Sequence, residues 1–304
     1  MAAAPVLMTT DLSLPLFIRG KVRDTYDLGD RLLIVATDRI SAFDVVLPCG
    51  IPDKGQVLNQ LSAFWFDQTR NIIPNHLIEV IDDVKSLNRY RPKGSRTAYP
   101  AFLARRSMIV KKVARLPVEC VVRGYLAGSA WVEYQQSGMV SGMSLPEGLK
   151  ESQKLPQPLF TPTTKAETGH DQPLTMKEME KLVGQARAAE IREKSLAVYN
   201  FAWEYALGRG IIIADTKMES GLLDGKLILI DELLTPDSSR FWDARQYRVG
   251  QSQPSYDKQP VRDWLVQSGW NKEPPAPMLP PEVIQATTKR YREAYERLTG
   301  KKLT

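Results

Sequence analysis

Cysteine and histidine are scarce in this chain of 304 residues, which contains two of each. Cys49 and Cys120 are too few for a disulfide framework and lack the spacing of metal ligands, so we expect buried structural thiols in a reduced compartment. His76 and His170 alone exclude a three-histidine zinc site and make a histidine triad hard to assemble. Any chemistry must therefore depend on Lys, Arg, Asp and Glu.

Long apolar runs are also missing. No stretch approaches the roughly 20 apolar residues that cross a bilayer, and the first fifteen residues have no basic start followed by an apolar run. We therefore expect a cytoplasmic protein with no membrane partner.

The net charge of +6 indicates anionic partners. The basic residues are scattered and form no recognised nucleic-acid motif, which favours small phosphorylated substrates over nucleic acid. A non-enzymatic RNA-binding protein is the alternative that the positive charge leaves open. For the oligomeric state, a monomer is the working assumption.

The chain length and its 43% apolar content predict about two domains. The strand-like and helical segments described next indicate a mixed α/β (α+β) class. Strand-like runs at 31–37 and 104–112 predict a mostly β lobe over residues 1–113. Residues 114–304 mix strands and helices and are predicted to form an α/β lobe.

Within the second lobe, 116–122 is predicted as a strand. The helical periodicity of 175–210 predicts two helices broken near Ala188. Residues 144–173 are too long for a simple connector and are expected to form a functional loop. A closing helix is predicted from Glu282 to Leu298, with Gly300 ending it.

The row IIIADTKME puts Asp215, Lys217 and Glu219 on one face of a strand that turns through Asp-Gly into LILIDE. A three-residue bulged loop places Asp231 on that same face, whereas a two-residue turn places it on the opposite face. The bulged version suits magnesium, which prefers one or two carboxylates plus substrate phosphates. A solvated face of an edge hairpin would give the same alternation.

The segment GKVRD offers a glycine turn, Gly20, followed by Lys21 and Arg23, which could neutralise phosphates. It lacks the full spacing of known phosphate-binding loops, so an ordinary basic hairpin is the competing interpretation. Asp38, Arg39, Ser41 and Asp44 follow a predicted strand directly, where binding groups often gather, although turn chemistry alone would also explain them.

Further along, Arg123 and Ser129 suit a phosphate cradle at a helix N-terminus, although Ser129 could simply cap that helix. Arg240 follows a proline turn and could equally be a solvated side chain. Lys165, Glu167, His170 and Asp171 stand together in the predicted loop, for which solvent exposure is the default interpretation.

The order of these segments is more informative than any single segment. GKVRD, TDRISAFD, PVECVVRGYLAGS, TPTTKAETGHD, IADTKME, DELLTPDSSRFW and SYDKQPVRDWL follow one another over about residues 17 to 270. In this order they resemble the longer form of the phosphoribosylaminoimidazole-succinocarboxamide synthase (SAICAR synthetase) family. The resemblance implies a two-lobed fold related to ATP-grasp ligases and protein kinases, with a nucleotide held between the lobes.

The resemblance also implies roles for single residues. ATP would contact Gly20, Lys21 and Arg23 through its phosphates, and Lys112 and Glu119 elsewhere. Glu219 and Asp231 would hold Mg²⁺, while Asp215 and Lys217 would line the reacting carboxylate. Arg123, Ser129 and Arg240 would bind a ribotide, and Asp38, Ser41, Lys258 and Arg262 are assigned broadly to substrate.

The implied reaction joins an imidazole carboxylate ribotide to L-aspartate at the expense of ATP, in purine biosynthesis. Such phosphoryl transfer needs magnesium and basic side chains and no histidine nucleophile. A kinase-like phosphotransferase is the alternative, but its HRDxxxxN loop is absent from the sequence. Ser220 departs from the family pattern, which has phenylalanine there. By strand alternation it should affect packing under the hairpin more than chemistry.

Overall fold

The computed structural model describes residues 6–90, 98–165 and 171–303, and the chain divides into two compact units. Unit 1 comprises Met1–Trp65, His76–Lys112 and Tyr256–Thr304, and unit 2 comprises Phe66–Asn75 and Val113–Ser255. The predicted boundary after residue 113 lies one residue from the change of unit between Lys112 and Val113. The units differ from the predicted lobes in two places, because 66–75 joins unit 2 and 256–304 joins unit 1.

Unit 1 contains a five-stranded antiparallel sheet in the order β1-β2-β3-β7-β6. Its strands are β1 (Leu16–Arg19), β2 (Arg23–Asp27), β3 (Arg31–Ala36), β6 (Leu77–Val80) and β7 (Ser107–Lys111). Leu33 and Val35 of β3 and Ile109 of β7 are fully buried in one hydrophobic cluster. The two strands predicted at 31–37 and 104–112 are thus confirmed as central strands of this sheet.

A second hydrophobic cluster explains why the C-terminal segment belongs to unit 1. Ile40 and Leu47, from the hairpin of β4 (Arg39–Ala42) and β5 (Val45–Gly50), pack with Val261 and Leu265 of α5 (Gln259–Gln267). Helix α1 (Lys54–Gln68) follows this hairpin, and α6 (Pro281–Thr299) closes the chain. The predicted closing helix is confirmed, with Gly300 ending it at a φ of 70°.

Unit 2 is built on two long antiparallel strands, β8 (Ala114–Tyr125) and β13 (Ile211–Leu223). The sheet order is β11-β8-β13-β14, with β12 also paired to β8 and β15 to β13. The shorter strands are β11 (Lys154–Phe160), β12 (Thr163–Thr164), β14 (Lys226–Ile230) and β15 (Ser239–Asp243). The segment 144–173, expected to be one functional loop, therefore carries two strands of the sheet.

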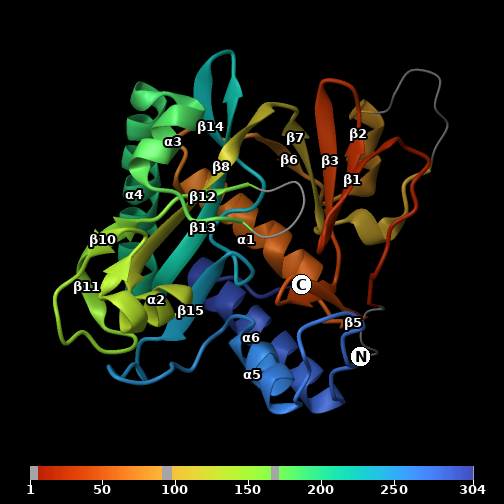
Figure 1. Ribbon diagram of the computed structural model, residues 1–304. Helices are drawn as coiled ribbons and strands as arrows, with labels where there is room; N and C mark the ends of the chain where they lie inside the picture. Colours follow the sequence, from red (N-terminus) through yellow and green to blue (C-terminus); the bar gives the residue numbers. More distant parts are fainter. Residues whose placement is uncertain (1–5, 91–97, 166–170, 304) are drawn as a thin grey trace. The chain divides into compact units, whose positions relative to one another are not determined.

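Helices α3 (Met176–Val183) and α4 (Gln185–Leu207) lie side by side, and α4 packs on β13 (Figure 1). The two predicted helices are confirmed, but the break lies at Gly184 rather than near Ala188. Gly184 has a positive φ of 84°, which glycine adopts without strain. A capping box of Thr175 and Glu178 starts α3.

The smaller elements of unit 2 are α2 (Ser129–Ser137), β9 (Met139–Val140) and β10 (Met143–Ser144). Two short 3-10 helices, Val84–Tyr90 and Ala101–Leu103, lie in unit 1. Among the described residues, none of the helices has the length and apolar character needed to span a membrane.

The packing of α5 predicts opposite outcomes for two neighbouring side chains. Leu265 is fully buried in the second cluster, so Leu265→Ala should lower the free energy of unfolding by about 2–5 kcal/mol through a residual cavity. Val266 is 56% exposed, so Val266→Ala should change it by less than about 0.5 kcal/mol. Urea denaturation of both variants tests this, and equal effects would contradict the assignment of the C-terminal segment to the core of unit 1.

Candidate functional site

The hairpin of β13 and β14 has a two-residue turn. Leu223 pairs with Lys226, and Asp224 and Gly225 between them have φ values of 50° and 74°. Two positive φ values identify the tight turn that Asp-Gly favours. The bulged loop that the magnesium hypothesis required is therefore wrong, and strand alternation alone would put Asp231 on the face opposite Glu219.

Asp231 nevertheless lies close to Glu219, by another route. Strand β14 ends at Ile230, which pairs with Glu219, and Asp231 follows it with a φ of 64°. The left-handed residue breaks the alternation of the strand. Burial, followed by the charge of Asp231, raises the pKa of Glu219. The two carboxylates predicted to bind a metal are thus neighbours because the backbone turns at Asp231.

On β8, Glu119 stands directly opposite Glu219 of β13. Two like charges in this position repel each other and destabilise a strand pair. Two lysines offset the repulsion. Lys165 Nζ lies 2.8 Å from Glu219 Oε1 and also pairs with Glu119, and Lys217 pairs with the other oxygen of Glu119. Glu119, Lys165, Lys217, Glu219 and Asp231 are called the carboxylate–lysine cluster below.

The lysines of this cluster differ in exposure. Lys165 is largely buried, and although burial favours its neutral form, the carboxylates of Glu219 and Glu119 outweigh burial and raise its pKa. The side chain of Lys217 is 47% exposed, and its Nζ also lies 3.5 Å from Asp171 Oδ2. Lys217 is therefore the cation of the cluster that a ligand can reach.

Further along the same face, Arg123 of β8 pairs with Asp215 of β13, and Asp215 also pairs with Arg240 of β15. Arg123 Nη1 donates to Asp215 Oδ2 at 3.2 Å, and Arg240 donates to the same oxygen. Arg123 Nη2 reaches Ser129 Oγ at 3.4 Å. These four residues, the arginine cluster, carry two guanidinium charges against one carboxylate, which leaves a positive site for an anion.

Ser129 does not cap α2, so the capping alternative is wrong. The N-cap is Gly128, with a φ of 58° and no side-chain hydrogen bond, and Ser129 is the first residue of the helix. A Cβ on Gly128 would lie 2.1 Å from Arg240 Nη2. The positive φ favours glycine here, and a Cβ would force the guanidinium of Arg240 to shift.

Unit 1 contains the other predicted residues. Gly20 N donates to Arg23 O at 2.8 Å and closes a turn, in which Lys21 pairs with Asp44. Lys112 Nζ lies 2.6 Å from Asp27 Oδ2, and Arg262 Nη2 lies 3.3 Å from Asp257 Oδ1. Ser41 is half-buried in β4, and Lys258, at the start of α5, is nearly buried.

Asp38 is enclosed rather than open to substrate. Its carboxylate accepts hydrogen bonds from Leu7 N, Gly55 N and Arg106 Nη1, at 2.8, 2.9 and 2.9 Å. The residue is fully buried. These contacts explain Asp38 as a structural group within unit 1, and the geometry gives no support to its predicted contact with substrate.

Sequence reasoning missed Lys165 as a site residue, because the surrounding TPTTKAETGHD was treated as a solvated loop. The available signal in the sequence was a lysine among Thr, Glu and Asp. In the structure this segment pairs through β12 with β8. Glu167 and His170 of the same segment lie outside the described residues. Thr161, whose Oγ1 accepts from Arg123 Nε at 3.1 Å, was also missed.

The metal hypothesis can be tested on the donor set. Among the described residues, no three His, Cys, Asp or Glu side chains are grouped to hold an ion by themselves. Magnesium needs only one or two protein carboxylates when substrate phosphates supply further oxygens. Glu219 and Asp231 meet that requirement, and their mutual repulsion is the kind that a divalent cation relieves, so the residues fit Mg²⁺.

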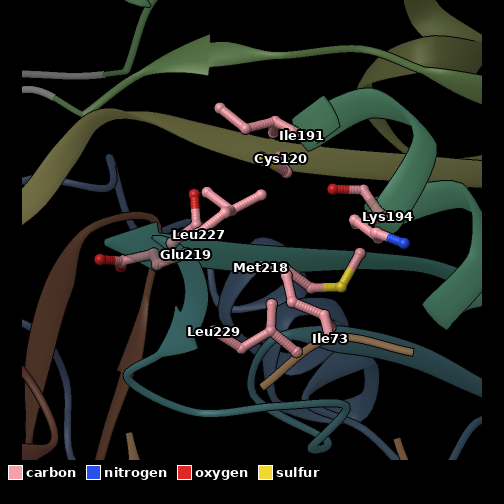
Figure 2. Close-up of a pocket in the computed structure, with 10 residues that line it drawn as sticks. Ile73, Cys120, Ile191, Lys194, Met218, Glu219, Leu227 and Leu229 are labelled. Atoms are coloured by element: carbon pink, nitrogen blue, oxygen red, sulfur yellow. The ribbon is translucent and has the colours of Figure 1, made fainter. Parts of the chain in front are cut away.

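Beneath the carboxylate–lysine cluster, the opposite face of β13 borders a small pocket (Figure 2). Its lining includes Cys120, Ser195, Met218 and Ser220. Ser220 lies on the helix-covered face as alternation predicts, is 3% exposed, and its Oγ has no hydrogen-bond partner among the described residues. Burial raises the pKa of the Cys120 thiol to about 12, which disfavours its thiolate and suits the expected structural role.

A two-unit α+β chain whose site combines an anion-binding arginine cluster with carboxylates and lysines is typical of enzymes that act on phosphorylated substrates. The family model described as SAICAR synthetase matches residues 16–277, and the chain belongs to this family. The phosphoribosylaminoimidazole-succinocarboxamide synthase of Thermodesulfovibrio yellowstonii is 54% identical over 295 residues, which are 97% of this chain and 99% of that protein.

Solved structures support the same family assignment. The SAICAR synthase from Saccharomyces cerevisiae, in complex with SAICAR, superposes with a TM-score of 0.89 at 44% identity and covers 98% of this chain and 99% of that one. A SAICAR synthetase in complex with ADP has a TM-score of 0.67 at 26% identity, covering 94% of this chain and 99% of that one. The predicted family and fold class are thereby confirmed.

Ser220 and Ser239 form a matched pair for stability. Ser220→Ala should raise the free energy of unfolding by about 1 kcal/mol, because it removes a buried hydroxyl without a partner. Ser239 Oγ donates to Thr216 Oγ1 at 2.8 Å, so Ser239→Ala should lower it by about 1 kcal/mol. Chemical denaturation gives both values, and a loss of stability in Ser220→Ala would show that its hydroxyl is satisfied.

Asp24 should make stability depend on pH. Burial favours its neutral form, but hydrogen bonds from Arg39 and Thr10 outweigh burial and hold its pKa below the ordinary 3.8. Since the folded-state pKa is depressed, this stabilisation is present above pH 3.8 and is lost as the pH falls through the folded-state pKa. Asp24→Asn should lower the free energy of unfolding by about 3 kcal/mol at pH 7, because it leaves Arg39 buried without its anionic partner.

The difference between wild type and Asp24→Asn should shrink on acidification, which denaturation curves between pH 7 and 3 would measure. Asp30, whose side chain is 79% exposed, provides the control, and Asp30→Asn should track wild type throughout. A difference that stays constant with pH would rule out the depressed pKa.

Proposed function

We propose that the clusters on β8 and β13 form the ribotide and metal half of an ATP-dependent ligase site. The SAICAR synthetase family, to which the chain belongs, condenses 5-amino-1-(5-phosphoribosyl)imidazole-4-carboxylate with L-aspartate. ATP drives the reaction and leaves as ADP and phosphate, in purine biosynthesis. We place this activity in the cytoplasm and expect no nucleic-acid or membrane partner.

One observation carries the assignment of residues. Arg123 and Asp215 lie at one end, and Glu119 and Glu219 at the other end, of a row on a single face of paired strands. Asp215 and Glu219 are four residues apart, which corresponds to about 13 Å along a strand. A ribotide has a phosphate at one end and a carboxylate at the other, so the positive and the metal-binding ends of the row match its two ends.

At the positive end, Arg123, Ser129 and Arg240 would bind the ribotide phosphate. Two guanidinium groups share one oxygen of Asp215, so an incoming phosphate would take over donors that Asp215 holds in the free protein. Asp215 thus keeps both arginines directed at the site before substrate arrives.

At the other end, Glu219 and Asp231 would hold Mg²⁺, which when bound supplies charge neutralisation to ATP phosphate oxygens. Lys217 would lie against the reacting carboxylate and disperse its charge. That carboxylate attacks the γ-phosphorus of ATP to give an acyl phosphate and ADP. The aspartate amine then attacks the acyl carbon, forms the amide and releases phosphate. Glu119 holds both Lys165 and Lys217, a position that favours orienting lysines over its predicted contact with nucleotide.

For the ATP phosphates we propose the turn of Gly20, Lys21 and Arg23, with Lys112 in the same unit. The ADP bound to a relative of the same fold supports a nucleotide site in this family. Ser41, Lys258 and Arg262 remain proposed substrate contacts.

The reaction is tested by ADP release from purified protein with Mg²⁺-ATP, aspartate and the ribotide, omitting each component in turn. ADP and the succinocarboxamide product should form only when all are present. ATP consumption without aspartate would favour the kinase-like alternative, and no consumption at all would contradict the ligase assignment.

Substitutions then test the metal end of the row. Glu219→Gln and Asp231→Asn should each lower kcat by at least about 100-fold, because the developing charge on phosphate loses its counter-ion. Both should also raise the Mg²⁺ concentration needed for half-maximal rate. Asp224→Asn, in the exposed turn of the same hairpin, is the control and should keep the wild-type rate. Wild-type magnesium dependence in the first two variants would remove them from the metal site.

A further inference from the structure

Three consecutive carbonyl groups of the GKVRD segment accept hydrogen bonds from Thr37 and Arg39. Gly20 O accepts from Arg39 Nη2 at 3.0 Å, and Lys21 O accepts from Arg39 Nε at 3.1 Å. Val22 O accepts from both the backbone N and the Oγ1 of Thr37, at 3.0 and 2.8 Å. In an extended strand successive carbonyls alternate in direction, so this arrangement is specific to the turn.

The direction of these carbonyls fixes the direction of the amides. In a planar trans peptide the N–H points opposite to the carbonyl of the same peptide unit. With Gly20 O and Lys21 O bound to Arg39, the N–H groups of Lys21 and Val22 therefore point away from it. Successive amides on one side of a turn form a concave site for anions such as phosphate.

Arg39 is itself held firmly. Its side chain is only 7% exposed, and its Nη2 lies 2.7 Å from Asp24 Oδ1. Its Nη1 donates to Met8 O at 2.6 Å. Asp24 Oδ2 accepts in turn from Thr10 N and Thr10 Oγ1, at 3.0 and 2.7 Å. The planar fork of guanidinium allows these bonds to be made at once, which the single ammonium of lysine cannot match.

We propose that Arg39 is a positioning residue for the nucleotide phosphates. It touches no substrate and sets the Gly20–Lys21–Val22 backbone so that its amides face an anion. The proposal rests on the proposed function, because it assumes that this turn binds the phosphates of ATP. Pre-organisation of this kind increases affinity by removing the cost of ordering the turn on binding.

The test compares two buried arginines of unit 1. Arg39→Lys keeps the charge beside Asp24 but loses the simultaneous bonds to Gly20 O and Lys21 O. Arg106→Lys is the matched control, because Arg106 is also buried and paired to a buried aspartate, Asp38, at 2.9 Å. Thermal unfolding of both variants measures their general effect on the fold.

The Kd of Mg²⁺-ADP, measured by calorimetry per native molecule, should rise about tenfold in Arg39→Lys and stay near wild type in Arg106→Lys. In steady-state assays, Arg39→Lys should raise KM for ATP while KM for ribotide and aspartate stay unchanged. A merely structural role would lower the melting temperature of both variants alike and leave these constants unchanged in the folded fraction, which would overturn the proposal.

Thr37 provides a second, milder test if Arg39→Lys does not fold. Thr37→Val removes only the Oγ1 bond to Val22 O and should raise the Kd of Mg²⁺-ADP about threefold, whereas Thr37→Ser should restore it. If both Arg39→Lys and Thr37→Val bind Mg²⁺-ADP with wild-type affinity, only the positioning role is contradicted, and the nucleotide site stands. Failure of the wild-type protein to bind Mg²⁺-ADP contradicts instead the proposed nucleotide site.

Discussion

The pairing of β8 with β13 is the constraint on which the site depends. Its register sets Arg123 beside Asp215 and Glu119 beside Glu219, so that opposite charges meet at one end and like charges at the other. A sheet optimised only for stability would avoid two glutamates face to face. Here the repulsion is compensated by Lys165 and Lys217, which makes this end of the row dependent on cations.

The need of the two glutamates for nearby cations also bears on the chemistry of the site. A cluster that is balanced by lysines, one of them 47% exposed, can exchange part of that balance for a metal ion or for a substrate carboxylate. The arginine cluster works in the opposite sense, because Asp215 occupies donors that an anion can claim. Internal counter-ions thus lie at both ends of the row and hold the side chains in orientation.

Backbone conformation decides several details that side-chain patterns leave open. The left-handed residue Asp231 brings its carboxylate towards Glu219 despite a turn that, by alternation, would send it to the other face. Gly128 leaves room for Arg240 over the start of α2, since a Cβ there would force the guanidinium to shift. In unit 1, Arg39 and Thr37 hold the carbonyls of the GKVRD turn from within. Each case depends on one or two residues with unusual geometry or burial.

The sequence by itself determined the family, the alternation of Asp215, Lys217 and Glu219, and the existence of the main strands and helices, because periodicity and motif order are local properties of the chain. It did not determine the length of the hairpin turn, the joining of 256–304 to unit 1, the burial of Asp38 or the role of Lys165. The turn is local, and the Asp-Gly pattern left its length open, whereas the other three features arise from contacts between residues far apart in the chain. Lys165 and Glu219, for example, are brought within 2.8 Å only when β12 and β13 both pair with β8. Tertiary structure decides which charges are neighbours, and electrostatic interaction falls with distance in space rather than with separation along the chain.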